Sequence, residues 1–308
     1  MKLIRGLQNL RRELQGSVVT VGAFDGLHLG HQALLRRLRG HASRLSRPAM
    51  MLTFEPTPRE FFSRGDPPAR LTSLRERYRL LGRMQVDALL ILRFTERLRS
   101  MTSDEFAELL AKSLGAPQVV VGHDFKFGQG GEATAASLTS AGQRLGFAVD
   151  VVDPVKVGGV RVSSSGVREA LSRGDLERAR EWLGRPYSMI GRVRKGEELG
   201  RKLGYPTANL RLERLRSPVQ GIFAVRVRGV ADGALPGVAS LGTRPTVNGR
   251  VPLLETHVFD FSGDLYGREI EVEFVAKLRD ERHFATLDAL VEQMNLDAAG
   301  ARRELGYG

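Results

Sequence analysis

Hydrophobic positions in the first half of the chain form short runs separated by longer amphipathic stretches. The runs span residues 17–21, 49–54, 88–94, 118–122 and 149–152. Between them, leucines recur at helical spacing, as at Leu34, Leu35 and Leu38. Short apolar strands that alternate with helices are typical of a parallel sheet with helices on both faces. We therefore expect an α/β domain in this half.

The pattern changes after about residue 185 to strands in which apolar and polar positions alternate. Such runs span residues 221–229, 253–261 and 269–278. The turn-forming pairs between them are Asp232-Gly233, Asn248-Gly249 and Ser262-Gly263. This combination is typical of an antiparallel β-barrel. Helical spacing returns over residues 284–305, so we expect a C-terminal helix that closes or flanks the barrel.

These two patterns divide the chain near Leu183–Pro186. At 308 residues the chain exceeds the usual size of one hydrophobic core. We expect two domains: residues 1–184, a Rossmann-like parallel sheet with flanking helices, and residues 185–308, an antiparallel barrel with C-terminal helices. Because each range carries its own motifs, we also expect residues 185–308 to fold alone.

Composition narrows the possible classes of function. Hydrophobic residues make up 42% of the chain, but no stretch approaches the roughly 20 apolar residues of a membrane-spanning helix. The N-terminus does not resemble a secretory signal, so we expect a cytoplasmic protein. The absence of cysteine excludes disulfides, thiolate zinc sites and cysteine nucleophiles. Hard cations such as Mg²⁺ remain as candidate metals.

The net charge of +12 favours anionic partners such as nucleotides and phosphates. The arginines are spread along the chain, which is typical of a solvated surface. An alternative is a nucleic-acid-binding protein with an OB-like barrel, which steeply salt-dependent binding to single strands would reveal. We favour small-molecule partners, with no nucleic acid and no membrane. The sequence does not predict an oligomeric state.

A glycine- and histidine-rich segment follows the first predicted strand and leads into a helix. Ligands of open parallel sheets bind beyond the carboxyl ends of the strands, where the next helix offers N–H groups to phosphate. His28 and His31 would stabilise charge on the phosphates of ATP during nucleotidyl transfer. Gly30 would leave space between the two imidazoles. The residues predicted to bind the nucleotide are Gly22, Phe24, Asp25 and Gly26.

Another alternative rests on Gly128, Gly130 and Ala133, which match the spacing of a dinucleotide-binding fingerprint. It would make the chain an NAD-dependent oxidoreductase. We reject it because residues 123–127 separate these glycines from the preceding strand, so the tight strand–turn–helix geometry is missing. Binding of a nicotinamide cofactor to the N-terminal domain would favour this alternative.

A second glycine-rich segment lies in the C-terminal domain. Its backbone N–H groups could surround a phosphate chain, with added charge from basic side chains. The residues predicted to do so are Gly196, Gly200, Arg201, Lys202 and Gly204. No Walker lysine signature occurs, so this is not a P-loop. Thr207 and Asn209 alternate along an extended segment, which places both oxygens on one face, where they could hold Mg²⁺ bound to ATP.

The N-terminal domain resembles the adenylyltransferase half of the bacterial bifunctional riboflavin kinase/FAD synthetases. The resemblance lies in residues 22–31, 54–62, 70–73, 121–128 and 162–168. It implies that Asp124 lies beside the nucleotide and flavin phosphates. It also implies that the triphosphate of ATP is bound at the helix start formed by Ser163, Ser164, Ser165 and Arg168. A serine-rich helix cap is the alternative for this last segment.

The chain departs from the family pattern at two places. Thr57 stands where many members have histidine, and the loop Gln129–Thr134 lacks the arginine expected near Gly131. We therefore assign no flavin or phosphate contact to this loop.

The C-terminal domain resembles the riboflavin kinase half of the same family. The resemblance lies in residues 191–209, 241–246, 254–257, 261–267 and 277–281. It implies that Glu255 is the base that accepts the proton of the ribityl hydroxyl, and that Arg279 contacts a substrate. Asp264 and Glu271 are competing carboxylates, which we interpret as surface charges.

The resemblance implies two reactions, each with ATP and Mg²⁺. Riboflavin would be phosphorylated to FMN in the barrel, and FMN would be adenylylated to FAD in the α/β domain. Both would be direct displacements at phosphorus without a covalent enzyme intermediate.

Overall fold

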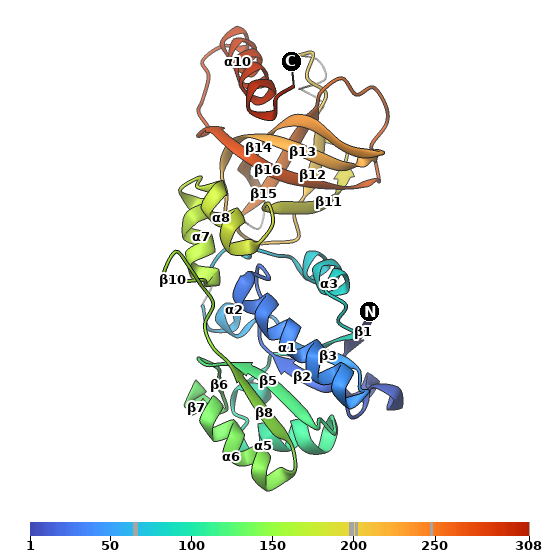
Figure 1. Cartoon of the computed structure of the whole chain (residues 1–308). Coiled ribbons are helices and arrows are strands. Elements are labelled where there is room, and N and C mark those ends of the chain that lie inside the picture. The colour runs from blue at the N-terminus through green and yellow to red at the C-terminus, as the bar shows by residue number, and fades with distance from the viewer. Residues whose placement is uncertain (64–66, 197–199, 201–202, 247–248, 308) are drawn as a thin grey trace. The chain divides into compact units, whose positions relative to one another are not determined.

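The computed structural model describes residues 1–63, 67–196, 200, 203–246 and 249–307. The chain forms two compact units (Figure 1). The first comprises Met1–Pro68 and Arg77–Val162, and the second comprises Ala69–Glu76 and Ser163–Gly308. We call Ala69–Glu76 the inserted segment, because it belongs to the second unit although it interrupts the first in sequence. The assignment of one activity to residues 1–184 and the other to residues 185–308 stays a prediction.

The first unit contains a six-stranded sheet in which every pair is parallel. Its strands, in spatial order, are β1 (Lys2–Arg5), β4 (Ala88–Arg93), β3 (Ala49–Glu55), β2 (Val18–Val21), β5 (Gln118–Gly122) and β8 (Ala148–Val152). The parallel sheet predicted from the apolar runs is confirmed. The edge strand β1 was not predicted, because only Ile4 of its four residues is buried and the apolar pattern is therefore weak.

Helices flank this sheet. They are α1 (Leu29–Leu45), α2 (Pro58–Phe62), α4 (Glu96–Arg99), α5 (Ser103–Glu108) and α6 (Ala135–Leu145), with α3 (Leu74–Arg83) spanning the boundary between the units. Two short hairpins pair β6 (Lys126–Phe127) with β7 (Ala133–Thr134) and β9 (Lys156–Val157) with β10 (Val160–Arg161). The core joins buried residues of the strands, such as Val19 and Leu52, to Phe106 and Leu138 of the helices.

The second unit is built on a closed antiparallel barrel, as predicted. Its strands, in spatial order, are β11 (Ser188–Arg194), β12 (Ala208–Arg211), β15 (Gly249–Val258), β14 (Gly233–Thr246), β13 (Gly221–Ala231) and β16 (Glu269–Arg279). The predicted turn at Asp232-Gly233 joins β13 to β14. Closure of the barrel pairs every strand on both sides and so removes exposed edges.

Among the residues that the structure describes, the second unit also contains the helices α7 (Ser164–Ser172), α8 (Leu176–Leu183) and α10 (Leu287–Leu305). The predicted C-terminal helix is α10, which packs on the barrel through Ala298 and Ala301 against Ala224 and Phe259. Among the residues that the structure describes, no helix is both long enough and apolar enough to cross a membrane.

Candidate active sites

The first candidate site lies where β2 ends and α1 begins. The chain switches direction across the sheet at β2, because β3 and β4 lie on one side of it and β5 and β8 on the other. Ligands of open parallel sheets bind at such a switch point, beyond the carboxyl ends of the strands. The loop Gly22–His28 occupies this position.

This loop has a strained backbone. Phe24 and Leu27 have φ angles of 49° and 46°, in the left-handed region that non-glycine residues rarely adopt. Packing enforces the conformation, since Phe24 is 3% exposed and Leu27 0%. Strain of this kind is concentrated at binding and catalytic sites, so the loop conformation favours a functional role.

The two histidines lie together at the start of α1. Their rings stack with centroids 3.7 Å apart, and the His28 Nδ1 accepts a hydrogen bond of 3.4 Å from the backbone N–H of His31. A Cβ on Gly30 would lie 3.0 Å from the His28 ring, so glycine leaves the space that the ring needs. The two imidazoles are therefore in contact, and the open space that was predicted between them is not present.

His31 is held in its neutral form. Burial lowers its pKa well below the ordinary value of 6.5, and the nearby His28 and Arg77 lower it further. Its Nδ1 is buried without a hydrogen-bond partner among the described residues. A buried polar atom without a partner is costly, and a ligand in this position would satisfy it.

Asp124 lies beyond the carboxyl end of β5, the strand that pairs with β2. Its carboxylate forms an ion pair with Arg161 of β10, and both side chains are exposed. Asp124 and the histidine pair therefore lie at the same edge of the sheet, after neighbouring strands. That they form one site stays a prediction.

A cavity of about 1030 Å³ opens in the same unit. We call it the aromatic cavity because phenylalanines from several elements line it: Phe54, Phe62, Phe94, Phe106, Phe125 and Phe127. Residues 128–133 of the loop after β6 also line it, although the sequence assigned them no contact. Aromatic walls of this kind suit a planar, apolar ring system.

Thr57 has a clear local role at this end of the sheet. Its hydroxyl caps α2, accepting from the Glu60 N–H at 3.4 Å, while the Glu60 carboxylate accepts from the Thr57 N–H at 2.9 Å. This reciprocal capping box stabilises the short helix. Threonine is thus a fitting helix cap at this position.

The helix start at Ser163 lies in the second unit, unlike the histidine pair. The Ser163 hydroxyl caps α7 by accepting from the Gly166 N–H at 3.2 Å. The Arg168 Nε donates to the Ala69 carbonyl of the inserted segment at 2.6 Å. Triphosphate binding by Ser163, Ser164, Ser165 and Arg168 stays a prediction.

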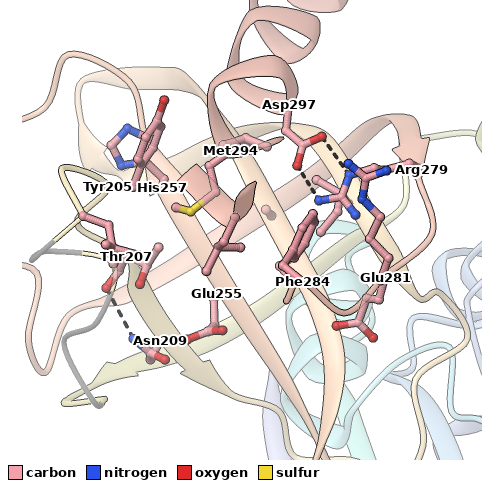
Figure 2. Close-up of a pocket in the computed structure, with 18 residues that line it drawn as sticks. Tyr205, Thr207, Asn209, Glu255, His257, Arg279, Glu281, Phe284, Met294 and Asp297 are labelled. Atoms are coloured by element: carbon pink, nitrogen blue, oxygen red, sulfur yellow. Dashed lines mark hydrogen bonds and ion pairs between the residues drawn. The ribbon is translucent and has the colours of Figure 1, made fainter. Parts of the chain in front are cut away.

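The second candidate site is a pocket of about 280 Å³ on the barrel, beside α10 (Figure 2). We call it the α10 pocket. Figure 2 shows Tyr205 and His257 at one side and the Arg279–Asp297 ion pair at the other, with Glu255 and Met294 between them. Of the predicted site residues, the pocket brings together Gly200, Thr207, Asn209, Glu255 and Arg279.

Strand alternation explains this gathering. Along β15, Leu254, Thr256 and Val258 are buried, while Glu255 is partly exposed and lines the pocket. Asn209 of β12 is the direct cross-strand partner of Glu255. Thr207 lies two positions before Asn209 and lines the same pocket, so the prediction that both share a face is confirmed.

A third cavity, of about 380 Å³, lies next to the same strand. We call it the loop pocket, because residues 261–266 form one of its walls and Gly196 another. Thr207 and Asn209 line both the loop pocket and the α10 pocket. These two polar side chains therefore lie between the two pockets.

Two of the predicted glycines have a steric reason. A Cβ on Gly196 would lie 2.6 Å from the Asn209 side chain, and one on Gly200 would lie 2.4 Å from the Tyr205 carbonyl. The glycines let this backbone approach the Tyr205–Asn209 segment closely. Arg201 and Lys202 lie outside the described residues.

Comparisons with known proteins match each half of the chain to a family model. Residues 10–166 match the model of the FAD synthetase family, and residues 183–305 match the riboflavin kinase family. The bifunctional riboflavin kinase/FMN adenylyltransferase of Escherichia coli strain K12 is 46% identical over 99% of this chain and 98% of its own length. That of Haemophilus influenzae is 43% identical over 98% of both chains.

The chain belongs to the bifunctional riboflavin kinase/FMN adenylyltransferase family. Among solved structures, one described as a macrolide-efflux protein from Streptococcus pneumoniae matches 98% of this chain and 99% of its own, with a TM-score of 0.83 and 31% identity. The two-unit fold is therefore shared along the whole length.

Arg279 has a structural partner in this member of the family. Its Nε and Nη2 bind the Asp297 carboxylate of α10 at 2.8 and 2.6 Å, and its Nη1 donates to the Asp280 carbonyl. The guanidinium thus ties α10 to the barrel wall. Contact with a substrate stays a prediction for this residue.

Asp264 and Glu271, the two carboxylates interpreted as surface charges, lie outside the α10 pocket. Asp264 lines the loop pocket and accepts from the Tyr266 N–H at 2.8 Å, so it shapes that wall. Glu271 accepts from the Ser188 hydroxyl at 2.7 Å. Neither residue lines the α10 pocket, whereas Glu255 does.

The sequence did not predict the aromatic cavity, nor that Thr207 and Asn209 line the loop pocket as well as the α10 pocket. Several of the phenylalanines occur in the family-like segments, so they were visible but had no assigned role. The signal available in sequence was their repeated occurrence at or just beyond the ends of predicted strands, as at Phe54, Phe94 and Phe125.

Proposed function

We propose that this chain converts riboflavin to FMN in the barrel unit and FMN to FAD in the parallel-sheet unit, with ATP as the phosphate and adenylyl donor. The observation that carries the kinase proposal is the position of Thr207 and Asn209 between two pockets, with Glu255 as cross-strand neighbour. A phosphoryl transfer needs two ligands that meet at one reacting phosphate.

In the kinase reaction, riboflavin occupies the α10 pocket and ATP the loop pocket. Glu255 accepts a hydrogen bond from the ribityl 5′-hydroxyl and takes its proton as the oxygen attacks the γ-phosphorus. The new bond joins that oxygen to phosphorus, the bond to the β-phosphate oxygen breaks, and ADP leaves.

Thr207 and Asn209 would hold the Mg²⁺ that accompanies ATP. The donor set fits, because Mg²⁺ prefers oxygen ligands and usually takes few from the protein. The backbone at Gly196 also fits, since a Cβ there would fill the space beside Asn209. When bound, the cation would neutralise charge on the phosphates. No cluster of three or more acidic, histidine or cysteine side chains suited to a metal occurs in the part of the chain that is described.

In the adenylyl transfer, the phosphates of ATP lie at the start of α1, where N–H groups and the helix dipole favour negative charge. The FMN phosphate attacks the α-phosphorus of ATP, and pyrophosphate leaves. His31, which is neutral, donates the hydrogen bond of its single N–H to a phosphate oxygen at this centre, and His28 lies beside it. The aromatic cavity holds the isoalloxazine ring of FMN.

We assign the same small-molecule partners, ATP, riboflavin and FMN, and no nucleic acid. The use of ATP in both reactions and the absence of cysteine fit a reducing, ATP-rich compartment, so we place the enzyme in the cytoplasm.

Incubation of the purified protein with riboflavin, ATP and Mg²⁺, followed by chromatographic separation of flavins, tests both assignments. We expect FMN with ADP, then FAD with pyrophosphate. Omission of Mg²⁺ should stop both reactions. If riboflavin were unchanged while added FMN still gave FAD, the kinase assignment would be wrong and the other would stand.

A further inference from the structure

The backbone hydrogen-bond ladder between β12 and β15 ends within the segment that carries Thr207 and Asn209. The last register pair between β12 and β15 is Ala208 with Thr256. Proline at 206 has no N–H, so it cannot donate to a ladder bond, although its carbonyl still needs a donor. The next residue along β15 is His257, and its Nδ1 lies 2.9 Å from the Pro206 carbonyl oxygen.

This contact fixes the tautomer of His257. A carbonyl oxygen can only accept, so Nδ1 carries the proton and donates it. The imidazole therefore takes the place of a backbone N–H and extends the attachment of β15 to the segment by one step. Thr207 lies directly between Pro206, held by the side chain, and Ala208, held by the ladder.

The other face of His257 is also supported. The Tyr205 ring packs edge-on against it with centroids 5.1 Å apart, and Phe259 packs against it at 5.7 Å. The Tyr205 hydroxyl donates to the Asn295 side chain of α10. Figure 2 shows Tyr205 and His257 together at the edge of the α10 pocket. Ring packing on two sides limits the orientations that the imidazole can adopt.

His257 is two residues from Glu255 on the same strand, so both side chains lie on one face of β15. We propose that His257 is a positioning residue of the kinase site: its Nδ1–H holds the Pro206 carbonyl and so fixes Thr207 and Asn209 relative to Glu255. The inference rests on the proposed kinase function. It assigns to His257 no contact with the reacting atoms.

Two amide variants separate this role from simple packing. In His257→Asn the amide nitrogen occupies the place of Nδ1, since both atoms are the same number of bonds from Cβ. In His257→Gln it occupies the place of Nε2 instead. Both variants keep a polar side chain, but only asparagine keeps the donor that faces Pro206.

The experiment measures riboflavin kinase kinetics of the intact protein and its His257→Asn, His257→Gln and His257→Ala variants, with thermal unfolding of each. Glutamine and alanine should lower kcat/KM for MgATP about 10- to 100-fold, the range expected when a reacting group is misplaced by about 1 Å. They should also raise the Mg²⁺ concentration needed for half-maximal rate. Asparagine should restore most of the activity.

Equal losses in the asparagine and glutamine variants would overturn the proposal, as would full activity of the alanine variant. A rise in the KM for riboflavin alone, in all three variants, would also overturn it, because that result indicates packing around the flavin. If one amide variant melts at a much lower temperature than the unmodified protein, only the other amide variant is used in the comparison. If the unmodified protein formed no FMN, the proposed function itself would fail. If the unmodified protein formed FMN and the His257 variants formed it at the same rate, only this inference would be refuted.

Discussion

The Arg214 guanidinium binds the Glu76 carboxylate through two hydrogen bonds, of 2.7 and 2.6 Å, although 138 residues separate the two in sequence. Their side chains are 1% and 4% exposed. Glu76 also accepts from the Ile190 N–H at 2.8 Å, and the Tyr187 hydroxyl donates to the Leu71 carbonyl at 3.1 Å. The inserted segment is therefore an integral part of the second unit.

Replacement of Glu76 by glutamine should destabilise the second unit by about 3–5 kcal/mol, because the buried Arg214 charge loses its partner. Urea unfolding followed by circular dichroism measures this. Arg75→Gln is the matched control: Arg75 is the neighbouring residue, and its ion pair with Glu269 is partly exposed. We expect the control to cost about 0–1 kcal/mol. Equal effects of the two variants would contradict the prediction.

The same pair bears on the expectation that residues 185–308 fold alone. Such a fragment lacks Glu76, so we expect it to unfold at lower urea concentration than the second unit of the intact chain. Arg214→Met should destabilise the intact chain, because it leaves the buried Glu76 carboxylate without its partner. It should change the stability of the fragment much less, because the fragment lacks the inserted segment that Arg214 contacts. An equal loss in both would refute this prediction.

Replacement of His31 by alanine should lower FAD formation from FMN about 10²–10³-fold, the usual cost of a lost preorganised contact to a transition state. FMN formation from riboflavin should be unchanged, since every residue assigned to the kinase lies in the other unit. Both rates are measured on one preparation with separated flavins. FAD formation at the unmodified rate would exclude His31 from the site.

Replacement of Glu255 by glutamine should lower FMN formation about 10²–10⁴-fold, because the amide keeps the shape but cannot take the proton. Glu271→Gln is the control, since Glu271 binds Ser188 and does not line the α10 pocket. A normal turnover number in the Glu255 variant would mean that another group is the base.

Replacement of Phe62 by alanine should raise the KM for FMN in FAD formation, with little change in the melting temperature. Phe62 lines the aromatic cavity and is 55% exposed, so its removal costs little packing. Loss of one aromatic contact is worth about 0.5–1.5 kcal/mol, which corresponds to roughly a 2- to 12-fold change in KM. Leu45→Ala, 40% exposed on α1, is the control and should leave the KM unchanged.

Local patterns in the sequence predicted most of the architecture. The parallel strands are continuous apolar runs because helices bury both faces, and the barrel strands alternate because only one face is buried. The edge strand β1 was not predicted, because a single buried residue makes no pattern. The helix α10 was predicted from the helical spacing over residues 284–305; it buries Ala298 and Ala301, whereas Leu287 is 59% exposed.

Contiguous motifs likewise predicted the histidine pair and the Thr207–Asn209 segment, because their geometry follows from a few consecutive residues. The aromatic cavity could not be predicted in this way, since Phe54 and Phe127 come together only through the sheet order. Nor does periodicity say against which core a connecting segment will pack. The docking of the inserted segment on the barrel depends on Arg214, which no local pattern links to Glu76.

The inserted segment imposes an order on the folding of a chain that is made from its N-terminus. All residues of the parallel-sheet unit have been synthesised once Val162 is added, and this unit can then fold. Glu76 cannot form its hydrogen bonds at that stage, because its partners Ile190 and Arg214 are added later. The barrel is thus completed by a segment that is synthesised before any of the barrel strands. The time at which Glu76 becomes buried would mark the completion of the barrel.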